Sequence, residues 1–272
     1  MDRTIMLGDG RRLISRDEGV PTGPAILSFH GSGMGRTHYR PHVEDATARG
    51  ARAIAYDRPG LGGSTRHPGY AIADHVTDVR ELAAALRIDR LVVWGASAGG
   101  MNALACGALA PDLVRAVALL APSVRVSDEP WTDPEAKRAE YATRAAEDRA
   151  RPTDDWIALL SDGVPPADVE ALRSGDAEWY AEDARDAMAQ GGDGWFDEGW
   201  AFRRDWGFRP EDVSVPVLIV HGKRDAWVDP AGSEALARRI PGSELRLTAE
   251  DGHLSVMRRV GEVNAWLLAH LA

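Results

Sequence analysis

The run "LVVWGASAGGMNALACGAL", residues 91–109, starts as an apolar strand, breaks into small residues around one serine and continues as a helix. The break "GASAG" has the G-x-S-x-G form, which is common by chance, so its strand-to-helix context decides its meaning. A turn this sharp strains the serine backbone, and the flanking glycines remove Cβ atoms that would collide there. The N-terminus of the helix favours an anion at the same place. We therefore predict that Ser97 is a nucleophile held clear of its own backbone.

Strand-like and helix-like segments alternate along most of the chain. "TIMLGDGRRLIS" predicts a hairpin with its turn at Asp9-Gly10, and Asp74 is the expected N-cap of the helix "HVTDVRELAAALR". Strand-like runs recur as "PAILSFHG", "ARAIAYDRPG", "LVVWG", "VRAVALLAP", "VPVLIVHG" and "SELRL". This alternation predicts a parallel sheet covered by helices on both faces, with ligands bound beyond the carboxyl ends of the strands.

One segment differs in composition from the rest of the 272 residues. Residues 122–212 hold 23 acidic and 11 basic residues, a net charge of −12, whereas the remainder carries +2. Six of the nine tryptophans also fall there. The length suits one sizeable domain, so this segment is best interpreted as a large insertion.

Two residues downstream suit the partners that a serine nucleophile needs. Asp225 follows a strong buried strand, and His253 follows the next strand. A histidine can take the serine proton, and a carboxylate must orient that histidine. The order serine, acid, histidine is the one found with G-x-S-x-G turns of this kind. Asp229, before Pro230, is the alternative acid.

Attack by Ser97 on a carbonyl also requires donors for the oxyanion. We predict the backbone N–H of Ala98 as one donor and that of Ser32, in "HGSGMG", as the other, with Gly33 as the alternative. His30 and His221 end strands in "HG" pairs and are interpreted as turn residues that support the sheet edge.

Composition excludes several classes of protein. The net charge of −10 argues against nucleic-acid binding, and no apolar run is long enough to span a membrane. The charged N-terminus is unlike a secretory signal, and a single cysteine allows no intrachain disulfide, so a cytoplasmic location is expected. That cysteine, Cys106, is expected to be a buried packing residue. No His, Cys and Asp cluster has metal-ligand spacing, so no metal or cofactor is expected. Monomer and homodimer both remain open.

The strings "HGSG", "YDRPGLGGS", "GASAGG", "HGKRD" and "DGH" together resemble the α/β-hydrolase fold superfamily, and "QGGDGWFDEGWAFRRDWGF" resembles a capped bacterial subgroup. The resemblance implies an α/β-hydrolase fold: a mostly parallel eight-stranded sheet flanked by helices, with a mobile helical cap inserted after the sixth strand. The core would comprise residues 1–122 and 213–272, and the cap residues 123–212. A serine nucleophile argues against haloalkane dehalogenases and epoxide hydrolases, which carry aspartate, and "HGSG" has a shorter glycine run than the HGGG lipases.

The loop "YDRPGLGGS" is expected to be rigid, with an internal salt bridge between Asp57 and Arg58 near the entrance to the site. A direct substrate role for Arg58 is the alternative.

These patterns predict a serine hydrolase that cleaves a carboxylic ester or related acyl bond of a small substrate through an acyl-enzyme. The acidic cap favours a neutral or apolar substrate, and its tryptophans would line the site or join cap to core. The alternatives are a carbon–carbon bond hydrolase or an acyltransferase with the same triad, or a non-catalytic ligand receptor.

Overall fold

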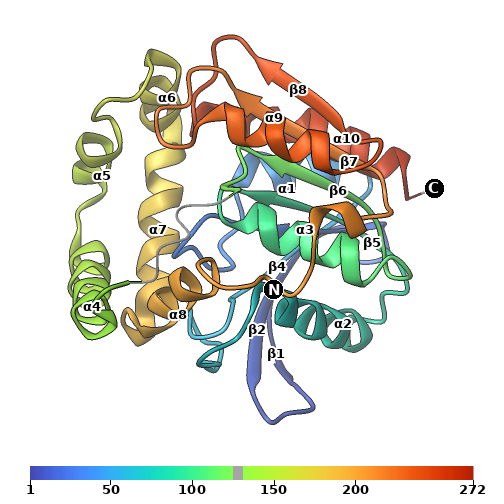
Figure 1. Cartoon of the computed structure of the whole chain (residues 1–272), viewed down its shortest axis with the longest axis horizontal. Coiled ribbons are helices and arrows are strands. Elements are labelled where there is room, and N and C mark those ends of the chain that lie inside the picture. The colour runs from blue at the N-terminus through green and yellow to red at the C-terminus, as the bar shows by residue number, and fades with distance from the viewer. Residues whose placement is uncertain (125–130, 272) are drawn as a thin grey trace.

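The computed structural model describes residues 1–124 and 131–271, and its centre is one sheet of eight strands (Figure 1). Their order is β1-β2-β4-β3-β5-β6-β7-β8; β2 pairs antiparallel with β1 and β4, and the other pairings are parallel. The predicted fold class, a mostly parallel eight-stranded sheet, is confirmed. The strands are β1 (Asp2–Met6), β2 (Arg12–Gly19), β3 (Ala25–Phe29), β4 (Arg52–Tyr56), β5 (Leu91–Ala96), β6 (Val114–Leu120), β7 (Val217–Gly222) and β8 (Glu244–Thr248).

Helices cover both faces of this sheet, because its central strands are buried on both sides and read as continuous apolar runs. Val93 of β5 packs in the core with α2, α3 and α9, whereas its neighbours Val92 and Trp94 pack with α1 and α10. Cys106 of α3 is buried in the first of these cores, as predicted. The core helices are α1 (Arg40–Ala48), α2 (His75–Leu86), α3 (Gly99–Leu109), α9 (Pro230–Arg239) and α10 (Val260–Ala269), with short turns η1 (Ile72–Asp74) and η5 (Ser255–Arg259).

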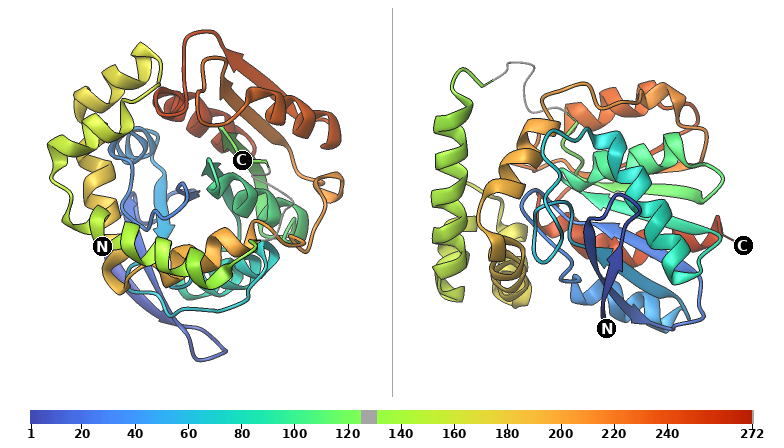
Figure 2. Two further views of the ribbon diagram at one scale, coloured as in Figure 1. Left: turned by 60° about the vertical axis from the view of Figure 1, so that its left-hand side comes forward. Right: turned by 90° about the horizontal axis from the view of Figure 1, so that it is seen from below.

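A helical insertion after β6 is also confirmed. Its helices gather on one side of the sheet and form a separate layer against the core (Figures 1 and 2). They are α4 (Pro134–Ala150), α5 (Thr153–Leu160), α6 (Pro166–Ala171), η2 (Leu172–Asp176), α7 (Ala177–Ala187), η3 (Met188–Gln190), α8 (Asp193–Ala201) and η4 (Pro210–Asp212). We call residues 131–212 the cap and the other described residues the core. Within the described chain, no helix combines the length and apolar character that crossing a membrane requires.

Two local predictions have different outcomes. The Asp9-Gly10 hairpin is confirmed: Gly10 has φ +87°, and Met6 of β1 pairs with Arg12 of β2. Asp74 does precede α2, but its carboxylate accepts from the N–H of Ala71 (2.8 Å) instead of capping the helix. The prediction of a capping side chain is therefore wrong, because a tighter local turn uses the same oxygen.

Different tryptophans of the cap pack in different places. Trp179 joins cap to core, since its indole N–H donates to Thr37 O (2.8 Å) and its ring packs against His30 and Tyr39. Trp131 and Trp200 pack against each other inside the cap, with ring centroids 5.2 Å apart.

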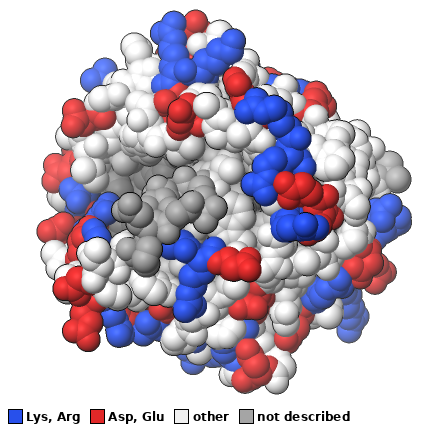
Figure 3. Space-filling model, in the orientation of Figure 1, with Lys and Arg blue, Asp and Glu red and all other residues white. Residues whose placement is uncertain are grey.

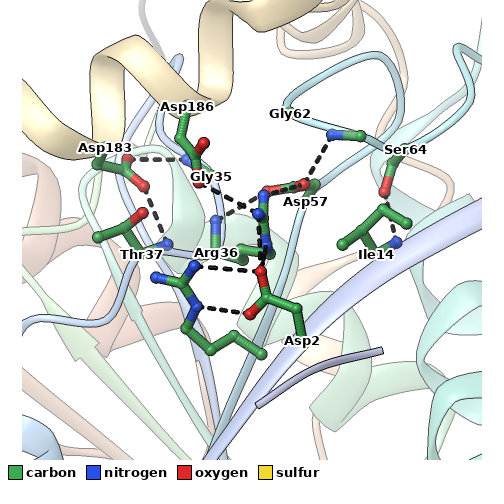
Figure 4. A network of polar contacts seen from close by, with 12 residues as sticks. Asp2, Ile14, Gly35, Arg36, Thr37, Asp57, Gly62, Ser64, Asp183 and Asp186 are labelled. Carbon is green, nitrogen blue, oxygen red and sulfur yellow. Dashed lines mark hydrogen bonds and ion pairs between the residues drawn. The ribbon is translucent and has the colours of Figure 1, made fainter. Parts of the chain in front are cut away.

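The predicted salt bridge between Asp57 and Arg58 is wrong. Asp57 instead pairs with Arg36 (2.7 Å), which also contacts Asp2 and Asp186 (Figure 4). Arg58 pairs with Glu198 of the cap (2.6 Å). Adjacent residues of an extended loop direct their side chains to opposite sides, so each finds a distant partner.

Buried histidines generate a prediction about acid stability. Burial lowers the pKa of His42 to about 4, so at pH 5 the folded state keeps this ring neutral while the unfolded chain protonates it. The unfolded state then binds more protons, and stability falls as pH drops below about 6.5. We expect His42→Gln to reduce the loss of unfolding free energy between pH 7 and pH 5 by about 2 kcal/mol relative to wild type.

The measurement is urea unfolding of both proteins at several pH values. The difference between variants is the readout because burial raises the pKa of Asp183 to about 7, which acts in the opposite direction. Identical pH dependence in His42→Gln and wild type would contradict the prediction.

Candidate active site

The turn between β5 and α3 holds Ser97 in a strained conformation. Ser97 has φ +52°, a value that residues with side chains rarely adopt. A Cβ on Gly95 would collide with Gly99 O, and a Cβ on Gly99 would collide with the carbonyl oxygens of Phe29 and His30. The predicted strain at the serine and the need for small neighbours are both confirmed.

The structure brings Asp225 and His253 together. Nδ1 of His253 donates to Oδ2 of Asp225 (2.7 Å), and Oδ1 of Asp225 accepts from the N–H groups of Trp227 (2.9 Å) and Val228 (2.8 Å). Burial acts to raise the pKa of Asp225, but hydrogen bonds from His221 and His253 outweigh it and hold that pKa well below its usual range. Asp225 is therefore a persistent anion that fixes the orientation of the His253 ring.

His221 does more than support the sheet edge. It is the next-to-last residue of β7, its Nε2 donates to Asp225 Oδ2 (3.0 Å), and its Nδ1 lies 2.7 Å from Ser233 Oγ. Sequence reasoning missed this contact, although the four-residue spacing from His221 to Asp225 across a strand end could have indicated it. The alternative acid, Asp229, lies at the N-cap of α9, where it accepts from the N–H of Ala231 (2.9 Å).

Ser97 and His253 line the same cavity, which has a volume of about 550 Å³. The Ser97 hydroxyl lies 3.3 Å from Ser123 Oγ. Among the described residues, Ser97 and His253 form no hydrogen bond with each other. Such contacts are often long in enzymes without substrate and tighten in the complex.

The loop after β3 lies beside the serine, since a Cβ built on Gly31 would be 3.7 Å from Ser97 Cβ. The N–H of Gly33 donates to Glu198 Oε2 (2.8 Å), so it is already engaged. Among the described residues, the N–H groups of Ser32 and Ala98 donate no hydrogen bond. This distribution favours Ser32 and Ala98 over Gly33 as oxyanion donors.

The cavity lies between the cap and the carboxyl ends of the strands. Apolar side chains from both parts form most of its wall: Met34, Leu120, Trp156, Leu159, Leu160, Trp179, Tyr180, Ala184, Met188, Trp195, Trp227 and Met257. Four charged side chains also line it: Arg144, Glu147, Asp148 and Arg151. Arg151 pairs with Asp148 (3.0 Å), and the Arg144 guanidinium lies 5.0 Å from the Trp195 ring centroid. Arg58 is not part of this lining in the described structure, so its direct role toward substrate is not favoured.

The sheet, the strained serine turn and the cavity at the strand ends define a protein of the α/β-hydrolase class. Residues 24–259 match the family model described as the alpha/beta hydrolase fold, and the chain belongs to this family.

Curated relatives cover almost the whole chain. A putative carbamate hydrolase of Variovorax paradoxus is 28% identical, with 93% of this chain and 94% of the relative covered. A 2-(acetamidomethylene)succinate hydrolase of Mesorhizobium japonicum is 29% identical over 81% of this chain and 78% of its own length. A thermophilic esterase from Thermogutta terrifontis has the same fold, with a TM-score of 0.75, 24% identity and 100% coverage of both chains.

Alanine substitutions at two glycines, one packed at the serine turn and one with room for a methyl group, should affect the free energy of unfolding differently. Gly99→Ala places a methyl group against two backbone carbonyls, and we expect it to lower the free energy of unfolding by about 1–3 kcal/mol. Gly232→Ala is the control: it lies in α9 with its nearest atom, from Val124, at 3.7 Å, and should be neutral or stabilising by up to about 1 kcal/mol. Urea unfolding measures both, and equal effects would contradict the packing argument.

Proposed function

We propose that this chain is a serine hydrolase that cleaves a carboxylic ester or related acyl bond of a small neutral or apolar substrate. The observation that carries the proposal is the shared cavity. A strained serine and a histidine that is already paired to a buried carboxylate face the same apolar space.

In the proposed reaction, the Ser97 hydroxyl leaves Ser123 and donates to Nε2 of His253. Ser97 Oγ attacks the carbonyl carbon as His253 takes the proton, and the N–H groups of Ser32 and Ala98 donate to the oxyanion. His253 then protonates the leaving alcohol, which gives an acyl-enzyme. Water, deprotonated by the same histidine, attacks this ester, and His253 passes the proton to Ser97 Oγ as the bond from that oxygen to the acyl carbon breaks and the acid is released.

The cavity wall supports a neutral or apolar acyl group, because a charge buried against indole and thioether side chains would lose its hydration. Acidic and basic side chains are intermixed over the face shown in Figure 3, and the Arg151–Asp148 pair shows the same mixing at the cavity. By their names, the two curated relatives described above hydrolyse a carbamate and 2-(acetamidomethylene)succinate, which supports a hydrolase reaction in general and gives no support to a neutral substrate in particular.

Ser97→Ala is expected to lower ester turnover by at least about 10³-fold, because no other group would form the acyl-enzyme. The measurement is hydrolysis of p-nitrophenyl esters of graded chain length. A fluorophosphonate should label wild type at Ser97, as peptide mapping by mass spectrometry would show, and should also label the control Ser243→Ala. Unchanged turnover or labelling in Ser97→Ala would refute the mechanism. Product transfer to an added alcohol would instead indicate an acyltransferase.

Substrate charge gives a separate prediction. The neutral p-nitrophenyl butyrate should have a kcat/KM at least about tenfold higher than the p-nitrophenyl half-ester of succinate, because the apolar wall cannot solvate the second carboxylate. Both rates are measured at pH 7 and the same ionic strength. A preference for the anion would contradict the neutral substrate class and point to Arg144 as its partner.

A further inference from the structure

Three helices of the cap each direct a buried carboxylate into loops of the core. The residues are Asp168 of α6, Asp183 of α7 and Glu198 of α8, and each is at most 1% exposed. Buried carboxylates are rare unless they are paired, so their partners reveal what they do. All three bind the core through backbone N–H groups.

Glu198 binds the loop that carries the predicted oxyanion donor. Its Oε2 accepts from the N–H of Gly33 (2.8 Å) and from the hydroxyl of Ser32 (3.0 Å), and Trp195 Nε1 also donates to that hydroxyl (2.9 Å). These contacts hold the loop at the Ser32 side chain and at the following residue, while the Ser32 N–H has no partner among the described residues.

Arg58 completes this arrangement from the core. Its Nε donates to Glu198 Oε1 (2.6 Å), and its two terminal nitrogens donate to His30 O (3.1 Å) and Gly31 O (2.7 Å). The loop is therefore fixed through its carbonyls by Arg58 and through its N–H and hydroxyl groups by Glu198. Neither charge is exposed, so removing one leaves the other buried and unpaired.

Asp168 binds the loop that carries His253. Its Oδ1 accepts from the N–H (2.8 Å) and the hydroxyl (2.5 Å) of Ser255, and that hydroxyl accepts from the N–H of Gly252 (2.9 Å). A Cβ on Gly252 would collide with the Asp168 carboxylate, so the glycine before the histidine permits this contact. Asp183 binds the segment after the oxyanion loop, accepting from the N–H groups of Gly35 (2.8 Å) and Thr37 (3.0 Å) (Figure 4).

We propose that Glu198 and Asp168 are positioning residues, through which the docked cap holds the oxyanion loop and the histidine loop in reactive geometry. This inference rests on the proposed function of the site. Neither side chain touches the reacting atoms; each acts through the backbone of a core loop.

The variants Glu198→Gln and Asp168→Asn keep the side-chain shape and remove the charge. In Glu198→Gln, the amide places an N–H₂ group opposite either Arg58 or Gly33. We expect kcat for a p-nitrophenyl ester to fall about 10- to 100-fold while KM changes little, because loop geometry matters most in the transition state. Asp168→Asn should act in the same direction through His253.

Asp197→Asn is the matched control. Asp197 lies on the same helix as Glu198 and is also buried, but it binds Arg66 (2.9 Å between Oδ1 and Nη2) and no active-site loop. It should change stability and leave kcat within about twofold of wild type.

Hydrogen–deuterium exchange separates positioning from general destabilisation. Glu198→Gln should speed exchange in residues 31–34 but not in 252–255, Asp168→Asn should do the reverse, and Asp197→Asn should do neither. An equal fall of kcat in all three variants, or exchange without loop specificity, would overturn the inference. Absence of ester turnover in wild type would refute the proposed function, whereas the exchange pattern would still decide whether the cap holds the loops.

Discussion

The close approach of the N-terminus of α3 to the end of β3 is the contact on which the rest of the site depends. Gly99 lies against the carbonyls of Phe29 and His30, so the serine turn and the loop after β3 meet backbone to backbone. The strain at Ser97, of order 1–3 kcal/mol for such a conformation, persists because hydrogen bonds hold both sides of the residue. Its N–H donates to Leu120 O (2.9 Å), and its carbonyl accepts from Ser123 N (3.0 Å). This one junction places the proposed nucleophile beside the N–H groups of Ser32 and Ala98, which have no partner among the described residues.

Burial alone does not determine the charge of the carboxylates near that point; the donors that face them do. Asp225 and Asp183 are both buried, yet their pKa values move in opposite directions. Asp225 receives hydrogen bonds from two histidines and two backbone N–H groups, which outweigh desolvation and keep it ionised. Asp183 receives backbone N–H groups without a cation, and desolvation raises its pKa to about 7. His221 belongs functionally with Asp225 for this reason.

Local spacing was enough to predict a parallel sheet covered by helices and the serine turn, because periodicity and small residues at fixed offsets encode local backbone geometry. Composition indicated the insertion, and its place after the sixth strand was implied by the resemblance to the α/β-hydrolase superfamily. The position of Asp225 and His253 after successive strands also follows from the rule that strand ends converge, and the structure joins these two residues. Partners that join the cap to the core could not be predicted. Arg58 and Glu198 are separated by 140 positions, and the sequence shows that the cap is acidic without showing which acids face inward. The incorrect Asp57–Arg58 pairing arose from assigning partners by sequence proximity.

The acidic residues of the cap thus have a structural role, which is separate from any influence of their charge on substrate binding. Glu198 and Asp197 bind core arginines, and Asp168 binds the N–H and hydroxyl of Ser255, so part of the negative charge docks the cap onto a core that carries a small positive excess. Breaking a buried ion pair of this kind costs about 3–5 kcal/mol when one charge is left buried. Movement of the whole cap as a rigid lid would expose several such contacts at once. The cavity lining also includes Leu159 and Trp227, which are 48% and 45% exposed and can move without breaking any of them. Displacing these two side chains would therefore leave the buried contacts of Glu198 and Asp168 with the core in place.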